Sequence, residues 1–179
     1  MPPKVSIVTA VYNGEKYLEK FTDSILNQTF DNFEFIIIDD GSTDNTLLKL
    51  QQIDDPRICI IQQSNQGQTS ALITGLKKAQ GGLIARIDAD DYSLPNRLTR
   101  QVEFMDTHPE IVLCGSRFQE LYGNNLSLQR VPFASTDAEI RKTISHFNPF
   151  NYIAHICMNH TSYNSICIIS RIYPIIFSW

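Results

Sequence analysis

The chain has 179 residues, of which 42% are hydrophobic and 19% are charged. These values are typical of a folded globular domain and exclude a disordered chain. The net charge of −4 at pH 7 excludes nucleic acid as the main partner, because a domain that binds nucleic acid presents a basic face to the phosphates. The four cysteines show no zinc-type spacing and fit the reducing cytoplasm, and there is no run of about 18 apolar residues to predict a membrane span.

Short apolar runs alternate with amphipathic stretches along most of the chain. The apolar runs predict β-strands, and apolar residues at helical spacing predict the helices between them. The expected strands cover 5–10, 33–38, 57–62, a run that starts at residue 83, and 111–114. The expected helices cover 15–28, 47–53, 69–79 and 95–108. This alternation predicts an α/β fold with an open, mostly parallel sheet that has helices on both faces.

The stretch 83–91 reads L-I-A-R-I-D-A-D-D and places Asp88, Asp90 and Asp91 directly after apolar residues. Crowded carboxylates repel and raise one another's pKa, so such a cluster is costly unless something binds it. If the strand continues to Asp90, then Asp88 and Asp90 lie on one face of it. Carboxylate oxygens suit Mg²⁺ or Mn²⁺, whereas the alternative interpretation is a solvated acidic turn or a helix cap.

Polar residues also follow the first two expected strands, at 9–13 and 39–44. In an open parallel sheet, ligands bind beyond the carboxyl ends of the strands. The three polar groups are therefore expected on one rim of the sheet. Acids at two adjoining strand ends are harder to explain as solvated turns than acids at one, and this coincidence favours a binding site.

The same residues match the chemistry of a nucleotide. The ring N–H and carbonyl groups of a base could meet Asp39 or Asp40 and the backbone of Thr9 and Ala10, while Tyr12 could stack on the base. A diphosphate needs a cation between itself and carboxylates. The sequence contains neither a Gly-rich dinucleotide loop nor a G-x-x-x-x-G-K-[ST] phosphate loop, so phosphate binding is expected to depend on that cation.

Four successive motifs resemble those of the family 2 glycosyltransferases, the inverting GT-A type: T-A-V-Y-N-G, I-I-I-D-D-G-S-T-D, N-Q-G-Q-T-S-A and I-D-A-D-D-Y-S-L-P-N-R-L. The resemblance covers about residues 4–116. It implies a GT-A-type, Rossmann-like α/β fold. It also implies a nucleotide-diphospho-sugar donor, most often UDP-linked, and inverting transfer to a saccharide or lipid-linked acceptor.

Carried over by position, the resemblance implies a nucleoside pocket lined by Thr9, Ala10 and Tyr12. It implies that Asp40, or its neighbour Asp39, binds the base. These residues all lie in the first two motifs.

The fourth motif supplies the rest of the donor site. The resemblance implies that Asp88 lies by the ribose and that Asp90 holds the Mg²⁺ or Mn²⁺ that bridges the phosphates. Asp91 is expected to support the metal or the sugar. At Leu72 and Ile73, by contrast, this sequence is apolar where family members often carry polar residues.

The general base of the family is not recognisable. Inverting transfer needs a base within hydrogen-bond reach of the acceptor hydroxyl, and in the family it is an acid well after the metal motif. This sequence has no acid after Glu139. Asp137 and Glu139 follow Thr136 at an expected helix start, where the helix dipole explains them, so neither is assigned a catalytic role.

We therefore expect an incomplete nucleotide-sugar-binding domain over 1–150 and an unassigned tail over 151–179, left by truncation or a frame shift. The alternative function is a non-catalytic nucleotide-sugar-binding fragment. A phospho-receiver domain is disfavoured because no acid pair follows the first strand. The expected setting is the cytoplasm, in bacterial surface-polysaccharide assembly, and peripheral association with the inner membrane stays open.

Overall fold

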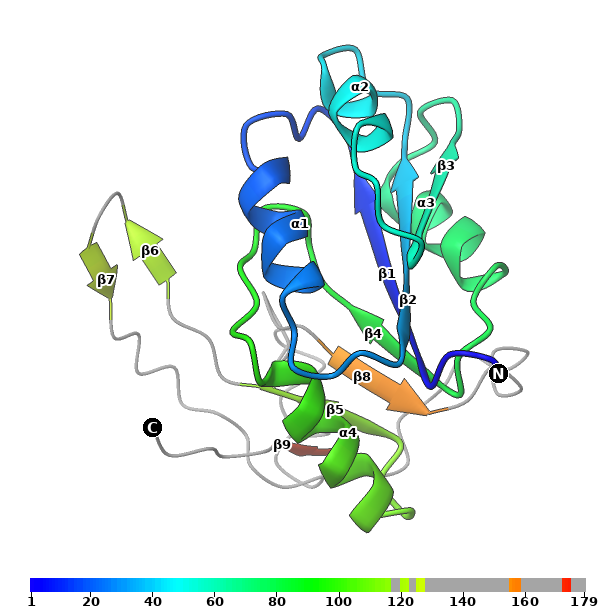
Figure 1. Ribbon diagram of the computed structural model, residues 1–179, viewed down its shortest axis with the longest axis vertical. Coiled ribbons are helices and arrows are strands. Elements are labelled where there is room, and N and C mark those ends of the chain that lie inside the picture. Colours follow the sequence, from blue (N-terminus) through cyan, green and yellow to red (C-terminus); the bar gives the residue numbers. More distant parts are fainter. Residues whose placement is uncertain (117–119, 123–124, 128–154, 159–171, 175–179) are drawn as a thin grey trace, which may run out of the picture.

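The computed structural model describes residues 1–116, 120–122, 125–127, 155–158 and 172–174. Four parallel strands make up one side of a seven-stranded sheet (Figure 1), in the order β3 (Ile58–Gln62), β2 (Phe33–Asp39), β1 (Val5–Val11) and β4 (Leu83–Arg86). The sheet continues with β8 (His155–Met158), β5 (Leu113–Gly115) and β9 (Ile172–Pro174). A separate pair is formed by β6 (Glu120–Tyr122) and β7 (Asn125–Ser127).

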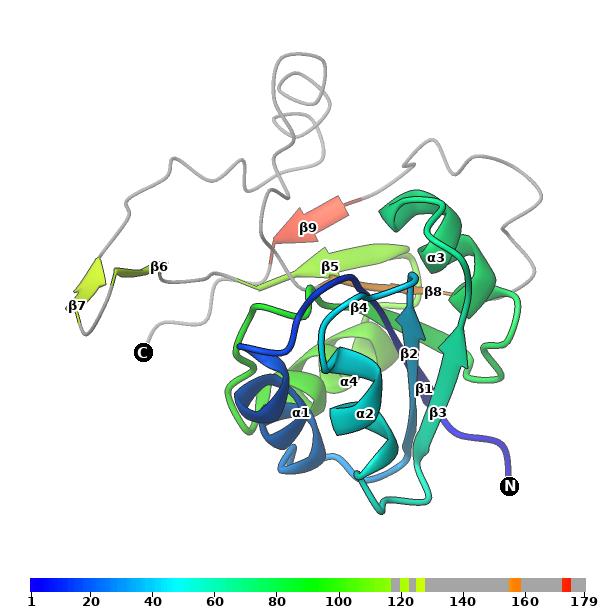
Figure 2. The same cartoon turned by 90° about the horizontal axis from the view of Figure 1, so that it is seen from above.

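Helices cover both faces of the parallel strands, as the sequence predicts (Figure 2). They are α1 (Leu18–Leu26), α2 (Thr46–Gln51), α3 (Gln68–Leu76) and α4 (Arg97–Thr107). The larger apolar core contains buried residues of α1, α2 and α4, and a smaller core on the opposite face packs α3 against β1 and β2. None of the helices in the described ranges is long and apolar enough to cross a membrane.

The uninterrupted apolar run of β2 reflects burial on both of its faces. Phe33, Phe35 and Ile37 belong to the larger core, while Ile36 and Ile38 belong to the smaller one. Because side chains alternate along a strand, the two acids at the end of β2 begin on opposite faces of the sheet. Because of this alternation, each acid contacts loops on a different face of the sheet.

The condition under which Asp88 and Asp90 would lie on one strand face, a fourth strand that continues to Asp90, is not met. β4 ends at Arg86, and the chain turns through 88–91, where the Asp91 N–H donates to Asp88 O at 3.2 Å. Asp88 and Asp90 therefore do not share a strand face.

The end of the sheet is mixed rather than parallel. β8 pairs antiparallel with both β4 and β5, so it lies between two strands that are closer together in the sequence. β8 and β9 both fall within 151–179, a stretch for which no element was predicted. The expected helix start at Thr136, with Asp137 and Glu139, lies outside the described residues.

A buried glutamine ties α1 to the loop that follows the acidic turn. Gln28 Nε2 donates to Leu94 O at 2.8 Å, and Gln28 Oε1 accepts from Leu98 N at 3.0 Å. Ser93 N donates to Ser24 Oγ of α1 at 3.1 Å. The C-terminal part of α1 therefore fixes where the chain runs between the acids and α4.

We expect Gln28→Ala to lower the free energy of unfolding by about 2–4 kcal/mol, because Leu94 O and Leu98 N lose their buried partner. Asn27→Ala is the matched control, since its exposed amide bonds only to Asp23 O of its own helix. Urea denaturation of both variants measures the difference. Equal losses in the two variants would show that Gln28 does not anchor the loop.

Candidate functional site

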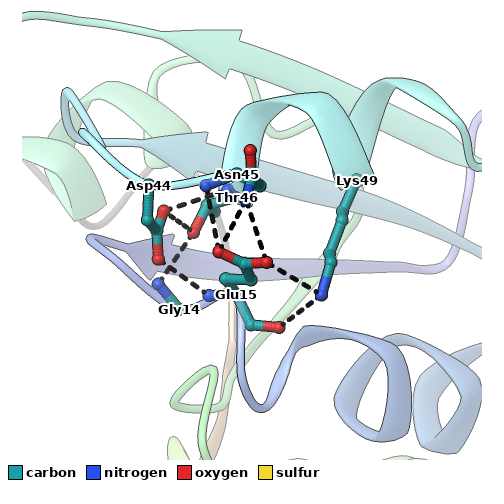
Figure 3. A network of polar contacts seen from close by, with 6 residues as sticks. All are labelled: Gly14, Glu15, Asp44, Asn45, Thr46 and Lys49. Carbon is teal, nitrogen blue, oxygen red and sulfur yellow. Dashed lines mark hydrogen bonds and ion pairs between the residues drawn. The ribbon is translucent and has the colours of Figure 1, made fainter.

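The loops after β1 and β2 are joined by side-chain hydrogen bonds (Figure 3). Gly14 N donates to Thr46 Oγ1 at 2.8 Å, and Glu15 N donates to Asp44 Oδ2 at 3.2 Å. In the reverse direction, Asn45 N and Nδ2 donate to the Glu15 carboxylate at 3.1–3.2 Å. The two loops therefore hold each other in place at the carboxyl ends of their strands.

These bonds keep both acids of the loop pair ionised. Hydrogen bonds from Asn45 are the main cause of a lowered Glu15 pKa. Burial acts to raise the pKa of Asp44, but bonds from Thr46 and from Glu15 N outweigh it and the pKa is lowered. Asp44 and Glu15 are therefore structural acids, since their oxygens serve the loops themselves.

Asp39 and Asp40 differ in what holds them. Asp39 is fully buried, and its Oδ1 accepts from Ser42 N at 3.2 Å, while no residue in the described ranges bonds to Oδ2. Asp40 is 3% exposed and contacts the loop before α3. Its Oδ1 accepts from Gln63 Nε2 at 2.7 Å and from Gln66 N at 3.0 Å, and its Oδ2 accepts from Gly67 N at 2.8 Å.

Burial acts to raise the pKa of Asp40, but the bonds from Gln66, Gln63 and Gly67 outweigh it and leave the pKa below its ordinary value. Asp40 is therefore an ionised carboxylate that faces the loop before α3. Gly41, which follows it, has a φ of 75°, and an added Cβ would lie 2.7 Å from Asn65 N. Only glycine allows the two loops to approach this closely.

The residues expected to line the nucleoside pocket have different exposures. Thr9 is fully buried, and its hydroxyl donates to Ile87 O at 2.9 Å, so its side chain ties β1 to the chain just after β4. Ala10 is half-buried, whereas Tyr12 is 51% exposed. Of these side chains, the Tyr12 ring is the one that can stack on a ligand.

The acidic turn after β4 is only partly neutralised. Arg86 Nη2 donates to Asp88 Oδ1 at 2.5 Å, and Gln68 Nε2 donates to the same oxygen at 3.2 Å. Asp90 is exposed. Burial, followed by the charges of Asp90 and Asp88, raises the pKa of Asp91 to about 6. Burial also raises the pKa of Asp88, although Arg86 works against it.

A buried arginine of α4, Arg97, makes hydrogen bonds beside the same turn. Arg97 Nη1 donates to Ser93 Oγ at 2.6 Å, and Arg97 Nε donates to Gln101 Oε1 at 3.1 Å. Burial lowers the Arg97 pKa to about 10, so the guanidinium keeps its charge at neutral pH, and that charge acts to lower the pKa of Asp91. Arg97 was not among the residues expected at the site, although Arg97 and Gln101 stand four residues apart in an amphipathic helix, which is a detectable pattern.

The acids of the turn supply the carboxylate oxygens that a hard cation prefers, and they supply enough of them for Mg²⁺. Within the described ranges, no three acidic, histidine or cysteine side chains converge to make an all-protein metal site. Mg²⁺ is commonly held by one or two carboxylates together with water and substrate phosphates. Burial is the main cause of the raised pKa of Asp91, and the charges of Asp90 and Asp88 add to it against those of Arg97 and Arg86. Asp90 and Asp91 are therefore suitable ligands for a cation that a diphosphate also contacts.

Comparisons with known proteins bear on the family and the fold of the chain. The family model of "Glycosyl transferase family 2" matches residues 6–166. EpsE of Bacillus subtilis, assigned as a glycosyltransferase, is 40% identical over 64% of this chain and 42% of its own length. The amylovoran biosynthesis glycosyltransferase AmsE of Erwinia amylovora is 31% identical over 86% of this chain and 58% of its own length. TarS of S. aureus in complex with UDP-GlcNAc has a TM-score of 0.65 and 27% identity over 74% of this chain and 39% of its own.

Fold and site together define an α/β domain of the GT-A type. The chain belongs to glycosyl transferase family 2, and the resemblance seen in its four motifs is confirmed. It spans less than two thirds of the length of the relatives that it matches.

The raised pKa of Asp91 gives a prediction for the metal-free protein. A carboxyl whose pKa is about 6 in the fold and 3.8 as a free group stabilises the fold at low pH, and this contribution is lost as the pH rises through 6. At neutral pH with a chelator, we expect Asp91→Asn to raise the free energy of unfolding by about 1–2 kcal/mol after solvent screening.

The stabilisation by Asp91→Asn should disappear below about pH 4, where both states of the wild-type carboxyl are protonated. Asp54→Asn, at an exposed acid outside the cluster, is the control and should change stability little. Chemical denaturation across the pH range measures both. A lower free energy of unfolding for Asp91→Asn at neutral pH would contradict the raised pKa of Asp91 in the fold.

Proposed function

We propose that this chain is the donor-binding part of a glycosyltransferase that uses a nucleotide-diphospho-sugar and inverts the anomeric centre. The observation that carries the proposal is the placement of acids beyond the carboxyl ends of two parallel strands, β2 and β4. β1 lies between β2 and β4 in parallel register, so Asp40 and the turn at 88–91 stand at the same edge of the sheet. The ribose separates the base of a nucleotide from its diphosphate. The two parts therefore need binding groups of different chemistry at separate places along this edge.

In this proposal each group at the edge has its own task. Tyr12 stacks on the base, and Asp40 accepts its ring N–H. Asp88 accepts a hydrogen bond from a ribose hydroxyl, and Arg86 donates a hydrogen bond to the same carboxylate. Asp90 and Asp91 would hold Mg²⁺ or Mn²⁺, which would offset the charge of the diphosphate leaving group. Gln28 and Arg97 position the turn by fixing the chain that follows it.

The bond changes are those of a single displacement. The acceptor oxygen forms a bond to the anomeric carbon, the bond from that carbon to the diphosphate oxygen breaks, and the hydroxyl proton passes to a general base. No residue is assigned as that base. The acceptor is a saccharide or lipid-linked glycan, consistent with AmsE, whose name gives it a role in amylovoran biosynthesis. The proposed setting is the cytoplasm, with contact at the inner membrane where lipid-linked acceptors lie.

The donor proposal predicts a ligand-dependent thermal shift. We expect UDP with Mn²⁺ to raise the unfolding midpoint, and NAD⁺ or ATP with Mn²⁺ to raise it little, because a ligand that binds the native state stabilises it. Equal shifts for the three nucleotides would contradict a donor site.

The metal ligand has its own test. We expect Asp90→Asn to remove most of the Mn²⁺-dependent gain in UDP affinity, because a neutral amide is a poor ligand for a hard cation. Glu103→Gln, at an exposed acid of α4, should leave the gain unchanged. Calorimetric titration with and without Mn²⁺ measures both variants. Unaltered binding by the Asp90 variant would show that the cluster is only a polar turn.

The alternative function, a non-catalytic nucleotide-sugar-binding domain, makes the same binding predictions and differs in turnover. General-base assistance typically contributes about 10²–10⁴-fold to the rate. Because no base is recognisable, we expect this 179-residue chain to bind UDP-sugars and to transfer sugar negligibly to acceptor extracts. Robust multiple turnover would show that a base is present within these residues.

A further inference from the structure

Asp40 offers a ligand fewer hydrogen-bonding positions than a free carboxylate does. A carboxylate has about four acceptor positions, two on each oxygen. In Asp40, the bonds from Gln63 Nε2 and Gln66 N fill both positions on Oδ1. The bond from Gly67 N fills one of the two positions on Oδ2. When the bonds among the described residues are counted, a single acceptor position, on Oδ2, is left for a ligand.

The three donors are themselves fixed in place. Thr74 of α3 donates from its hydroxyl to Gln63 Oε1 at 2.9 Å, which leaves the amide nitrogen of Gln63 directed at Asp40. Gly67 has a φ of 86°, a conformation that favours glycine and that sets the direction of its N–H. Asp40 is 3% exposed, so a ligand reaches only a small part of the carboxyl group. Replacing any of these donors by a ligand group therefore has a free-energy cost, because each loss would leave a buried polar group without a partner.

We propose that Gln63 is a specificity-determining residue, which selects a base with one ring N–H by occupying the position on Asp40 that a second donor would need. This inference rests on the proposed function, in which Asp40 meets the base. Uracil and thymine present one N–H between two carbonyl groups, and this N–H fits the single position on Oδ2. Guanine presents two adjacent donors, which pair with both oxygens of a carboxylate, and Oδ1 is already filled.

The remaining bases are disfavoured for a different reason. Adenine and cytosine present a ring nitrogen lone pair where uracil has its N–H. Such a lone pair faces the ionised Asp40 carboxylate and is repelled by it. The pattern of donors around Asp40 therefore separates uracil and thymine from the other three bases without any residue that contacts the base carbonyls.

The test compares nucleoside diphosphates on the wild-type chain. Calorimetric titration with UDP, dTDP, GDP, CDP and ADP, each with Mn²⁺, measures the five dissociation constants. We expect UDP to bind about tenfold or more tightly than GDP, CDP and ADP, because a hydrogen bond to a charged group is worth that factor or more. We expect the dissociation constant of dTDP to be closer to that of UDP than the dissociation constant of GDP is. Any difference between UDP and dTDP reports the effect of the sugar and the methyl group, because the two bases share the same N–H.

A variant of Gln63 tests its role directly. Gln63→Met keeps a similar volume and removes the donor, which opens a position on Oδ1, and we expect the ratio of the GDP to the UDP dissociation constant to fall by about tenfold. Gln62→Met is the matched control, since Gln62 is exposed and the same change one residue earlier should leave the ratio unchanged. Circular dichroism checks that both variants fold, and if Gln63→Met does not, the wild-type series decides the inference by itself.

The outcomes separate the two proposals. Similar binding of UDP and GDP by the wild type, or the same ratio in Gln63→Met as in the wild type, would overturn the role of Gln63 and leave the donor site standing. Failure of all five nucleotides to bind in the presence of Mn²⁺ would contradict the proposed function itself.

Discussion

Asp88, Asp90 and Asp91 place three carboxylates in the turn after β4, and two arginines of the chain, Arg86 and Arg97, act against their charge. Burial is the main cause that raises the pKa of Asp91 to about 6, and the charges of Asp90 and Asp88 add to it. Gln28, which follows α1, holds the chain after the turn through its bonds to Leu94 O and Leu98 N. In the proposed function, a cation bound at this turn would relieve the repulsion among the acids, so that ligand binding would stabilise the fold.

The acids at the end of β2 have the opposite character. The bonds from the loop before α3 compensate the charge of Asp40 and lower its pKa, so this carboxylate stabilises the fold at neutral pH. The same rim of the sheet thus carries Asp40, whose charge is compensated by hydrogen bonds, and the acidic turn at 88–91, which is only partly neutralised. A nucleotide-sugar has matching parts, since its base offers a single directed hydrogen bond while its diphosphate brings charge that needs a cation. In the proposed function, this contrast between the two strand ends lets one site bind both the base and the diphosphate of the donor.

The sequence was sufficient to predict the parallel strands and their common rim, because both depend on local patterns. The apolar runs of β1 and β2 mark strands buried on two faces, and each acid cluster follows its strand directly. It was also sufficient to expect Asp40 beside the base, through the resemblance of its motif, and that role remains a prediction.

Long-range contacts were not predictable in the same way. The bonds from Gln63, Gln66 and Gly67 to Asp40 join residues 23 to 27 positions apart, and nothing in the local sequence specifies them. β8 inserts between β4 and β5 although it lies far along the chain and shows no clear periodicity. β4 ends at Arg86, and the acids at 88–91 lie in a turn rather than in a continued strand.

The central claim is that the ends of β2 and β4 form one donor site, with Asp40 at the base and the turn at 88–91 at the diphosphate. The most direct test is a crystal structure of the chain with UDP and Mn²⁺. The account predicts the uracil N–H within hydrogen-bond distance of Asp40 Oδ2, with Gln63 still bonded to Oδ1, and Mn²⁺ bound by Asp90 between the turn and the phosphates. A UDP molecule bound away from this rim, or Mn²⁺ bound without a contact to the turn, would contradict it.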